Sequence, residues 1–328
     1  CIKILDTPGH QDFSEDTYRT LMAADSAVMV IDASKGVEAQ TRKLFKVCVM
    51  RHIPIFTFIN KLDREAKDTF ELLDDIEKEL GIATCPINWP IGSGKEFKGV
   101  YDRAKREVEL FSDTKKGTAM GEVKMIPIDA PETEELIGAD AKDILADEIE
   151  LLDGAAAEFD QELVDKGQLS PVFFGSALTN FGVETFLKHF LKMTTSPLPR
   201  KSDHGEIDPM TEKDFSAFVF KIQANMNKAH RDRIAFMRIC SGEFEAGMSV
   251  YHVQGGKDVR LSQPQQMMAS ERKMIDKAYG GDIIGVFDPG IFSIGDTLTT
   301  SKEKFAYEGI PTFAPEHFAR VRQAVSYT

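Results

Sequence analysis

The first 200 residues alternate short apolar runs with amphipathic segments, and this alternation constrains the fold more than any other feature. The apolar runs are residues 2–5, 27–31, 55–59 and 171–174. Such runs are typical of strands that are buried on both faces of a sheet. Between them, residues 37–50 and 68–80 carry charged and apolar side chains at helical spacing. Alternating strands and helices predict an open parallel α/β sheet, whose ligands bind beyond the carboxyl ends of the strands.

The composition changes after residues 197–209, a polar segment rich in proline that we expect to be a linker. The runs beyond it are short, β-branched or aromatic, and separated by glycines; they are residues 215–222, 234–240, 248–253 and 283–287. Short strands at this spacing predict a small antiparallel β-barrel. The four cysteines form no CxxC pair, which argues for a reducing cytosol and against a zinc or disulfide framework.

The residues that follow the first run are a candidate magnesium- and phosphate-binding loop: Asp6, Thr7, Pro8, Gly9 and His10. An aspartate at the carboxyl end of a strand can reach Mg²⁺ through a water molecule, because this ion requires hard oxygen ligands. A glycine shortly after it lets a backbone N–H approach a phosphate oxygen, because no Cβ stands in the way.

A second loop follows residues 55–59 and contains Asn60, Lys61 and Asp63. The carboxylate of Asp63 can accept two hydrogen bonds from guanine, one from N1–H and one from the exocyclic amine. Adenine lacks this pair of donors, and a buried carboxylate left without them costs on the order of several kcal/mol. Lys61 would lay its aliphatic stem along the base, and Asn60 would connect neighbouring loops. A helix-capping loop is the alternative interpretation.

A third loop, Ser176, Ala177 and Leu178, follows residues 171–174. The backbone N–H of Ala177 would donate a hydrogen bond to guanine O6, an acceptor that adenine lacks. The triplet carries little information by itself. As the third loop at a strand end, in this order along the chain, it supports the same guanine site.

These loops resemble the third, fourth and fifth signature elements of GTP-binding domains, and residues 6–10 together with 32–41 resemble the translational GTPases. Longer strings resemble the bacterial peptide chain release factor 3 family; they are residues 12–21, 87–92, 171–175, 219–226 and 230–238. The resemblance covers nearly the whole chain. It implies an α/β GTPase-type open parallel sheet, lacking the P-loop strand, followed by an all-β translation-factor barrel.

The resemblance also implies a function. The family consists of ribosome-dependent GTPases of translation termination, which promote the departure of class 1 peptide chain release factors after peptide release. GTP, GDP and Mg²⁺ are the implied ligands. The ribosome, through its RNA, and class 1 release factors are the implied partners, and we expect a cytoplasmic protein with no membrane or DNA partner. Carried over by position, Asp6 would hold Mg²⁺ through water, Gly9 would sense the γ-phosphate, and His10 would position the attacking water.

The barrel carries a basic cluster that is a candidate contact with ribosomal RNA phosphates, and a solvated barrel rim is an equally good interpretation. The candidate residues are Lys221, Lys228, His230, Arg231, Arg233 and Arg238. A contact of this kind would make binding dependent on salt. The net charge of the chain is −13, and residues 129–165 alone contain 14 Asp or Glu against one Lys. The acidity is therefore confined to one segment, expected to be a solvated helical face.

On this resemblance, residues 1–200 are a partial GTP-binding domain with an acidic insertion around residues 90–165. Residues 201–305 are the barrel, and residues 306–328 begin a truncated third domain. The 328 residues contain no GxxxxGKS/T sequence, and residues 92–95 match only part of it. We therefore expect a piece of a longer protein that binds GTP weakly by itself, is inactive alone and exposes unpaired strand edges. An elongation factor G-like GTPase and a non-catalytic ribosome-binding remnant are the alternatives.

Overall fold

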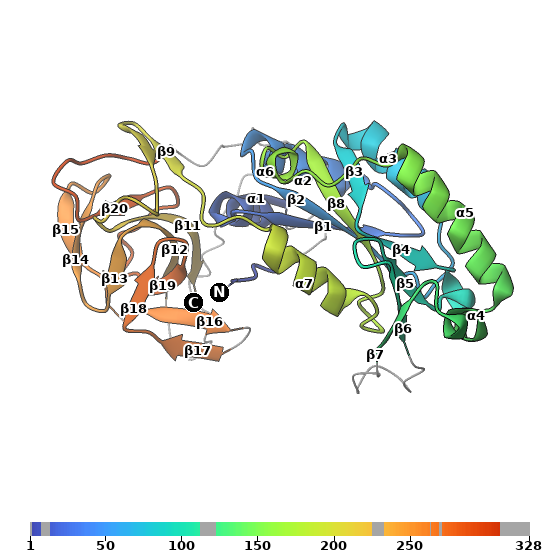
Figure 1. Ribbon diagram of the computed structural model, residues 1–328. Helices are drawn as coiled ribbons and strands as arrows, with labels where there is room; N and C mark the ends of the chain where they lie inside the picture. The colour runs from blue at the N-terminus through green and yellow to red at the C-terminus, as the bar shows by residue number, and fades with distance from the viewer. Residues whose placement is uncertain are drawn as a thin grey trace, which may run out of the picture. The chain divides into compact units, whose positions relative to one another are not determined.

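The computed structural model describes residues 2–7, 14–111, 123–224, 233–262, 264–268 and 271–308. The chain divides into two compact units, Cys1–Leu198 and Pro199–Thr328, and each has a hydrophobic core of its own (Figure 1). Among the helices within the described ranges, none has both the length and the apolar character that crossing a bilayer would require.

The first unit is built on a parallel sheet of four strands in the order β1-β2-β8-β3. The strands are β1 (Ala27–Asp32), β2 (Ile55–Asn60), β8 (Leu169–Phe174) and β3 (Ala83–Pro86). All three pairings are parallel. The open parallel α/β sheet predicted from the sequence is therefore confirmed, and three of its predicted strands are β1, β2 and β8.

Helices cover both faces of this sheet, as the side chains of β2 show. Because successive residues of a strand point to opposite faces, Ile55 and Ile59 join one core cluster, whereas Phe56 and Phe58 join another. The first cluster includes residues of α2 (Ala39–Met50) and α3 (Thr69–Leu80), which are the two helices predicted from the sequence. The second cluster includes Phe186 and Phe190 of α7 (Val183–Met193). A further helix, α1 (Ser14–Ala23), packs against α2.

The predicted strand at residues 2–5 is wrong. These residues have no regular secondary structure, and Ile4 is 79% exposed. A buried strand needs a hydrogen-bonded neighbour to satisfy its backbone groups, and no described strand pairs with residues 2–5. Among the described strands, β1 pairs only with β2. Val28 and Val30 of β1 are exposed on the face of the sheet to which Phe56 and Phe58 of β2 also point.

The segment between β3 and β8, where the sequence predicts an acidic insertion around residues 90–165, contains in its described residues an antiparallel sheet that was not predicted and three helices. An antiparallel sheet has the order β4-β5-β6-β7, with β4 (Asn88–Ile91), β5 (Gly99–Asp102), β6 (Glu107–Phe111) and β7 (Val123–Pro127). A short 3-10 turn, η2 (Gly94–Glu96), links β4 to β5. Helices α4 (Pro131–Ile137), α5 (Ala139–Ala155) and α6 (Gln161–Asp165) carry the acidic segment, in line with the helical face that the sequence predicted.

The second unit is all β within its described residues, as the sequence predicted. An eight-stranded antiparallel sheet has the order β15-β14-β20-β11-β12-β19-β16-β17, and a separate ribbon pairs β13 with β18. Its central strands are β11 (Ser216–Ala224), β12 (Arg233–Ser241), β19 (Ile283–Phe287) and β20 (Thr297–Thr299).

The outer strands of the sheet are β14 (Ser249–His252), β15 (Lys257–Arg260), β16 (Gln265–Met268) and β17 (Glu271–Met274), and the ribbon is β13 (Glu243–Glu245) with β18 (Lys277–Tyr279). The segment predicted as a plain linker instead contains a hairpin, β9 (Arg200–Ser202) and β10 (Gly205–Ile207), because a turn at residues 203–204 lets these short strands pair. Most of the predicted third-domain segment, residues 309–328, lies outside the described residues.

Candidate functional site

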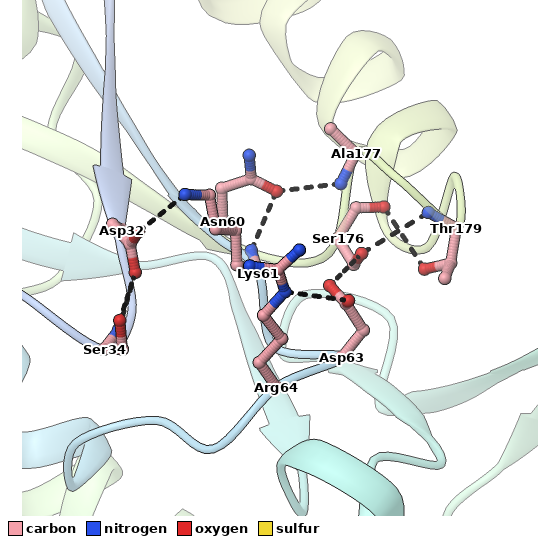
Figure 2. Close-up of polar contacts among 9 residues, drawn as sticks. All are labelled: Asp32, Ser34, Asn60, Lys61, Asp63, Arg64, Ser176, Ala177 and Thr179. Atoms are coloured by element: carbon pink, nitrogen blue, oxygen red, sulfur yellow. Dashed lines mark hydrogen bonds and ion pairs between the residues drawn. The ribbon is translucent and has the colours of Figure 1, made fainter.

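Polar side chains gather at the carboxyl edge of the parallel sheet, where three neighbouring strands end. Asp32 is the last residue of β1, Asn60 is the last residue of β2, and Ser176 follows β8 by two residues. Because the strands are parallel and adjacent, their carboxyl ends meet at one edge. Figure 2 shows that the side chains from the three loops point toward one another there.

Asp63 and Ser176 are joined directly, although 113 residues separate them along the chain. The Ser176 hydroxyl donates to Asp63 Oδ1 over 2.6 Å. The second oxygen, Oδ2, lies 3.9 Å from Arg64 Nε, and the Asp63 side chain is 19% exposed. Asp63 therefore has one carboxylate oxygen fixed by the protein, and its second oxygen has only a long ionic contact with the largely exposed Arg64.

Asn60 links the second loop to the third. Its Oδ1 accepts hydrogen bonds from the backbone N–H of Lys61 and of Ala177, both over 2.8 Å (Figure 2). Lys61 has a φ of 73°, a left-handed conformation that a non-glycine residue adopts only where its surroundings hold it. The N–H of Ala177, which the sequence assigns to guanine O6, is thus already donated to Asn60. A purine oxygen at this N–H would have to share or replace that bond.

Lys61 extends across the sheet edge to β1. Its Nζ lies 2.7 Å from Asp32 Oδ2, and both the hydroxyl and the backbone N–H of Ser34 donate to Asp32 Oδ1. Burial by itself raises the pKa of Asp32, but the hydrogen bonds from Lys61 and Ser34 outweigh it and lower the pKa to about 2. Asp32 is therefore a carboxylate at neutral pH, and it holds the stem of Lys61 beside Asn60.

Close backbone contacts fix the third loop against the second. The N–H of Gly175 donates to the carbonyl of Ile59 over 3.0 Å, and the N–H of Leu62 donates to the carbonyl of Gly175 over 3.3 Å. A Cβ at position 175 would lie 2.3 Å from the carbonyl oxygen of Phe181, so only glycine fits there. The loop at Ser176 is thus tightly packed and held on the side that faces Asp63.

The remaining predicted nucleotide residues are exposed, lie in an irregular segment or fall outside the described residues. Leu178 is 68% exposed. Asp6 and Thr7 lie in the irregular segment before the first gap, and Asp6 is exposed. Pro8, Gly9 and His10 lie outside the described residues. Of the predicted nucleotide-binding residues, the structure brings together Asn60, Lys61, Asp63, Ser176 and Ala177.

Sequence reasoning missed Asp32 and Ser34 as members of the cluster. Asp32 is the last residue of β1, and it is paired in register with Asn60, the last residue of β2. The rule that ligand-binding residues follow the carboxyl ends of parallel strands would have identified it. Within the described residues, no group of three or more His, Cys, Asp or Glu side chains could hold a metal ion.

The candidate RNA-contact residues of the second unit differ in their surroundings. Lys228, His230 and Arg231 lie outside the described residues, and Lys221 is half-buried. Arg233 donates to Asp288 Oδ2 over 2.6 Å and to the carbonyl of Phe292 over 3.0 Å. The expectation is wrong for Arg238, because this residue is 8% exposed and its guanidinium donates to the carbonyl of Gly281 inside the unit.

Comparison with known proteins agrees with this arrangement. Residues 1–196 match the family model of the elongation factor Tu GTP binding domain, and residues 214–301 match that of elongation factor G domain 2. A crystal structure of a protein from Thermus thermophilus superposes with a TM-score of 0.68 over 92% of this chain and 44% of that chain. Its sequence identity is 23%, so this likeness concerns the fold.

Curated relatives are much closer in sequence. A peptide chain release factor 3 from Symbiobacterium thermophilum is 63% identical over 98% of this chain. Proteins of the same name from Gloeobacter violaceus and Trichormus variabilis are 56% and 55% identical over the same share. The chain spans about 60% of the length of these relatives.

The first family model covers well over half of the chain, and the polar cluster lies within the matched residues. The strand order and the convergence of the three loops on one sheet edge fit a nucleotide-binding domain of this type. The chain therefore belongs to the family of the elongation factor Tu GTP binding domain.

Proposed function

We propose that the protein containing this chain is a ribosome-dependent GTPase of translation termination, and that Asp63 recognises the guanine base. The observation that carries the proposal is the bond between Ser176 and Asp63, which places the carboxylate of one strand-end loop beside the backbone of another. Asn60 Oδ1 connects the same two loops through Ala177. Lys61 pairs with Asp32 at the end of a third strand, so three loops that are distant in sequence surround one small region at the sheet edge.

The chemistry of this region favours guanine over adenine. The Asp63 oxygens accept from N1–H and the exocyclic amine of guanine, and the Ala177 N–H turns from Asn60 to O6. Adenine offers neither the two donors nor the O6 acceptor, so its binding would leave a desolvated carboxylate unsatisfied. Lys61, anchored to Asp32, offers its methylene stem to one face of the base.

Mg²⁺ and the phosphates belong to the loop that begins at Asp6. The exposed carboxylate of Asp6 is a hard oxygen ligand, and Mg²⁺ bound together with phosphates requires only one or two carboxylates from the protein. We assign Asp6 to Mg²⁺ through water, with Thr7 and Pro8 shaping the loop and Gly9 beside the γ-phosphate. The bound ion would neutralise phosphate charge. His10 would hold the attacking water, and the ribosome would complete the arrangement.

The cellular role follows from the relatives. Proteins named peptide chain release factor 3 match nearly the whole chain, which supports the ribosome and class 1 release factors as partners, and hence a place in the cytoplasm. The match of the second unit to elongation factor G domain 2 supports a contact with the ribosome. Lys221, Lys228, His230, Arg231 and Arg233 remain candidates for that contact, which salt would weaken.

The test uses a chimera in which this chain replaces the matching part of the Symbiobacterium thermophilum relative. Hydrolysis of GTP is measured with and without ribosomes, and departure of a class 1 release factor from post-termination ribosomes is followed by fluorescence. We expect ribosome-stimulated hydrolysis and accelerated departure. His10→Ala should keep GDP affinity but slow the stimulated hydrolysis, because water is no longer positioned.

Two outcomes would contradict the proposal. Hydrolysis without any effect on release factor departure would favour an elongation factor G-like GTPase. Ribosome binding without hydrolysis, in the presence of a folded chimera, would favour a non-catalytic remnant. An equal stimulated rate in His10→Ala would remove the catalytic role of this residue alone.

A further inference from the structure

Asn88 lies at the point where the chain leaves the parallel sheet, and its side chain is entirely buried. Its Oδ1 accepts a hydrogen bond from the backbone N–H of Phe174 over 2.7 Å. Its Nδ2 donates to the backbone carbonyl of the same residue over 3.1 Å. One side-chain amide therefore satisfies both backbone groups of the last residue of β8.

These two bonds extend the pairing of β8 beyond the end of its neighbour. The ladder between β3 and β8 ends at Pro86 and Val172, and the N–H of Ile87 then donates to the carbonyl of Val172 over 2.9 Å. From Asn88 onward the backbone turns away into β4 of the insertion, and the amide takes the place of a further backbone partner. On its other side, β8 pairs with β2 as far as Phe174. The end of β8 is thus hydrogen-bonded on both sides.

The next residue of the insertion holds the side chain of Phe174. The ring centroids of Trp89 and Phe174 are 5.3 Å apart in an edge-to-face arrangement, and both residues are fully buried. The indole N–H of Trp89 donates to Glu148 Oε2 over 2.9 Å, which ties the ring to α5. Asn88 and Trp89 therefore fix the backbone and the ring of Phe174 from the same side.

Phe174 is two residues before Ser176, whose hydroxyl is bonded to Asp63. Only Gly175 separates the clamped residue from the loop that holds the carboxylate. We propose that Asn88 is a positioning residue for base recognition: by fixing the end of β8, it sets the place of Ser176 and, through Ser176, that of the Asp63 carboxylate. This inference rests on the proposed function, because it assigns to the insertion a part in the guanine specificity of that site.

The test compares GDP with IDP, whose base lacks the exocyclic amine that Asp63 would accept from. The Kd of both nucleotides is measured by calorimetry on the chimera described above. Asn88→Asp keeps the shape of the side chain but removes the donor to the Phe174 carbonyl, and Asn88→Ser keeps a shorter hydroxyl. We expect each variant to reduce the ratio of the IDP Kd to the GDP Kd by about tenfold, equivalent to about 1.4 kcal/mol.

Thr57→Val is the matched control. Thr57 and Ser170 share a buried hydrogen bond of 2.8 Å in the middle of the same sheet, away from the carboxyl edge. This variant also removes a buried polar contact between β2 and β8, so a merely structural effect would appear in it as well. We expect a lower melting temperature but an unchanged nucleotide ratio.

The outcomes separate this inference from the proposed function. If the unaltered chimera shows no preference for GDP over IDP, the guanine site itself is wrong. If that preference is present and both Asn88 variants keep it, or if Thr57→Val reduces it equally, Asn88 has no positioning role. Should Asn88→Asp fail to fold because of its buried charge, Asn88→Ser decides by the same ratio.

Discussion

At the scale of single residues, the site depends on short polar bonds between loops and not on any one side chain. Asp63 receives the Ser176 hydroxyl, and Asn60 receives two backbone N–H groups. The first bond fixes the carboxylate that we propose accepts from guanine, and the bonds to Asn60 hold the loops of Lys61 and Ala177 together. Preorganised groups of this kind lose little freedom when a ligand binds, which is why their loss weakens binding.

Ser176→Ala should weaken GDP binding without changing the fold of the chimera. The hydroxyl fixes Asp63 Oδ1, and its loss releases a partly buried carboxylate. A single hydrogen bond of this type contributes about 1 kcal/mol, so the Kd for GDP should rise roughly fivefold. Thr179→Ala is the control, because the Thr179 hydroxyl contacts the same loop only over 3.5 Å. Equal Kd values for the unaltered protein and Ser176→Ala would show that Asp63 needs no such support.

The sequence identified those site residues that directly follow a predicted strand. Asn60, Lys61, Asp63, Ser176 and Ala177 are adjacent to runs whose burial the sequence reveals, and the structure brings them together. Asn88 could not be found in this way. Its partner is the backbone of Phe174, 86 residues away, and a side chain that bonds to backbone leaves no complementary residue type in the sequence.

At the scale of elements, the insertion is connected to α7 by two buried carboxylates. Asp102 at the end of β5 bonds to His189 over 3.1 Å, and Glu109 of β6 accepts from the hydroxyl of Thr185. Both carboxylates are at most 3% exposed. Since α7 follows the loop at Ser176, the insertion supports that loop from the helix side as well as from the strand side.

Acid should loosen the link between β5 and α7. Burial by itself raises the pKa of Asp102, but hydrogen bonds from His189 and Lys105 outweigh it and lower the pKa from 3.8 to about 2. A carboxyl with a lowered pKa stabilises the fold above its unfolded pKa, and this contribution is lost as the pH falls from about 4 to about 2. The isosteric variant Asp102→Asn should therefore unfold at lower denaturant concentration than the unaltered protein at about pH 6.

The difference in unfolding free energy between these two proteins should shrink as the pH falls toward about 2, because protonation of Asp102 removes the charge that the asparagine variant already lacks. Denaturant titrations at several pH values measure this directly. The pKa of Glu109 is raised mainly by burial and also by the charge of Asp102, so Asp102→Asn relieves part of this shift and the comparison reports on both carboxylates. A difference in unfolding free energy that stays constant from about pH 6 to about pH 2 would contradict the assignment.

Elements with a distinct apolar pattern were predictable, and the short strands of the insertion were not. The strands β1, β2 and β8 follow from continuous apolar runs, and the helices α2 and α3 follow from apolar residues at helical spacing. The four strands of the insertion have four or five residues each, and β4 contains Pro90. Strands this short carry too few residues to display a period. Residues 2–5 do have an apolar pattern, but they form no strand, because no described strand lies beside them to accept and donate their backbone hydrogen bonds.

At the scale of the whole molecule, two cores of different kinds lie in one chain. The α/β unit and the all-β unit have separate hydrophobic clusters, and the change in composition near residues 197–209 indicates where the sequence passes from one to the other. The alternation of patterns revealed both fold classes because each class has its own period. What sequence patterns could not reveal is which distant segments meet outside the recognised motifs, since contacts such as Asn88 with Phe174 span 86 residues.

The measurement that tests the central claim most directly is nucleotide preference after Asp63→Asn. The claim is that strand-end loops from across the first unit converge on one guanine base, with Asp63 as the acceptor of its two donors. In the chimera, we expect the unaltered protein to bind GDP more tightly than XDP. In Asp63→Asn the preference should reverse, because the new amide donates to the oxygen that xanthine carries in place of the amine. An undiminished preference for GDP in the variant would contradict the account.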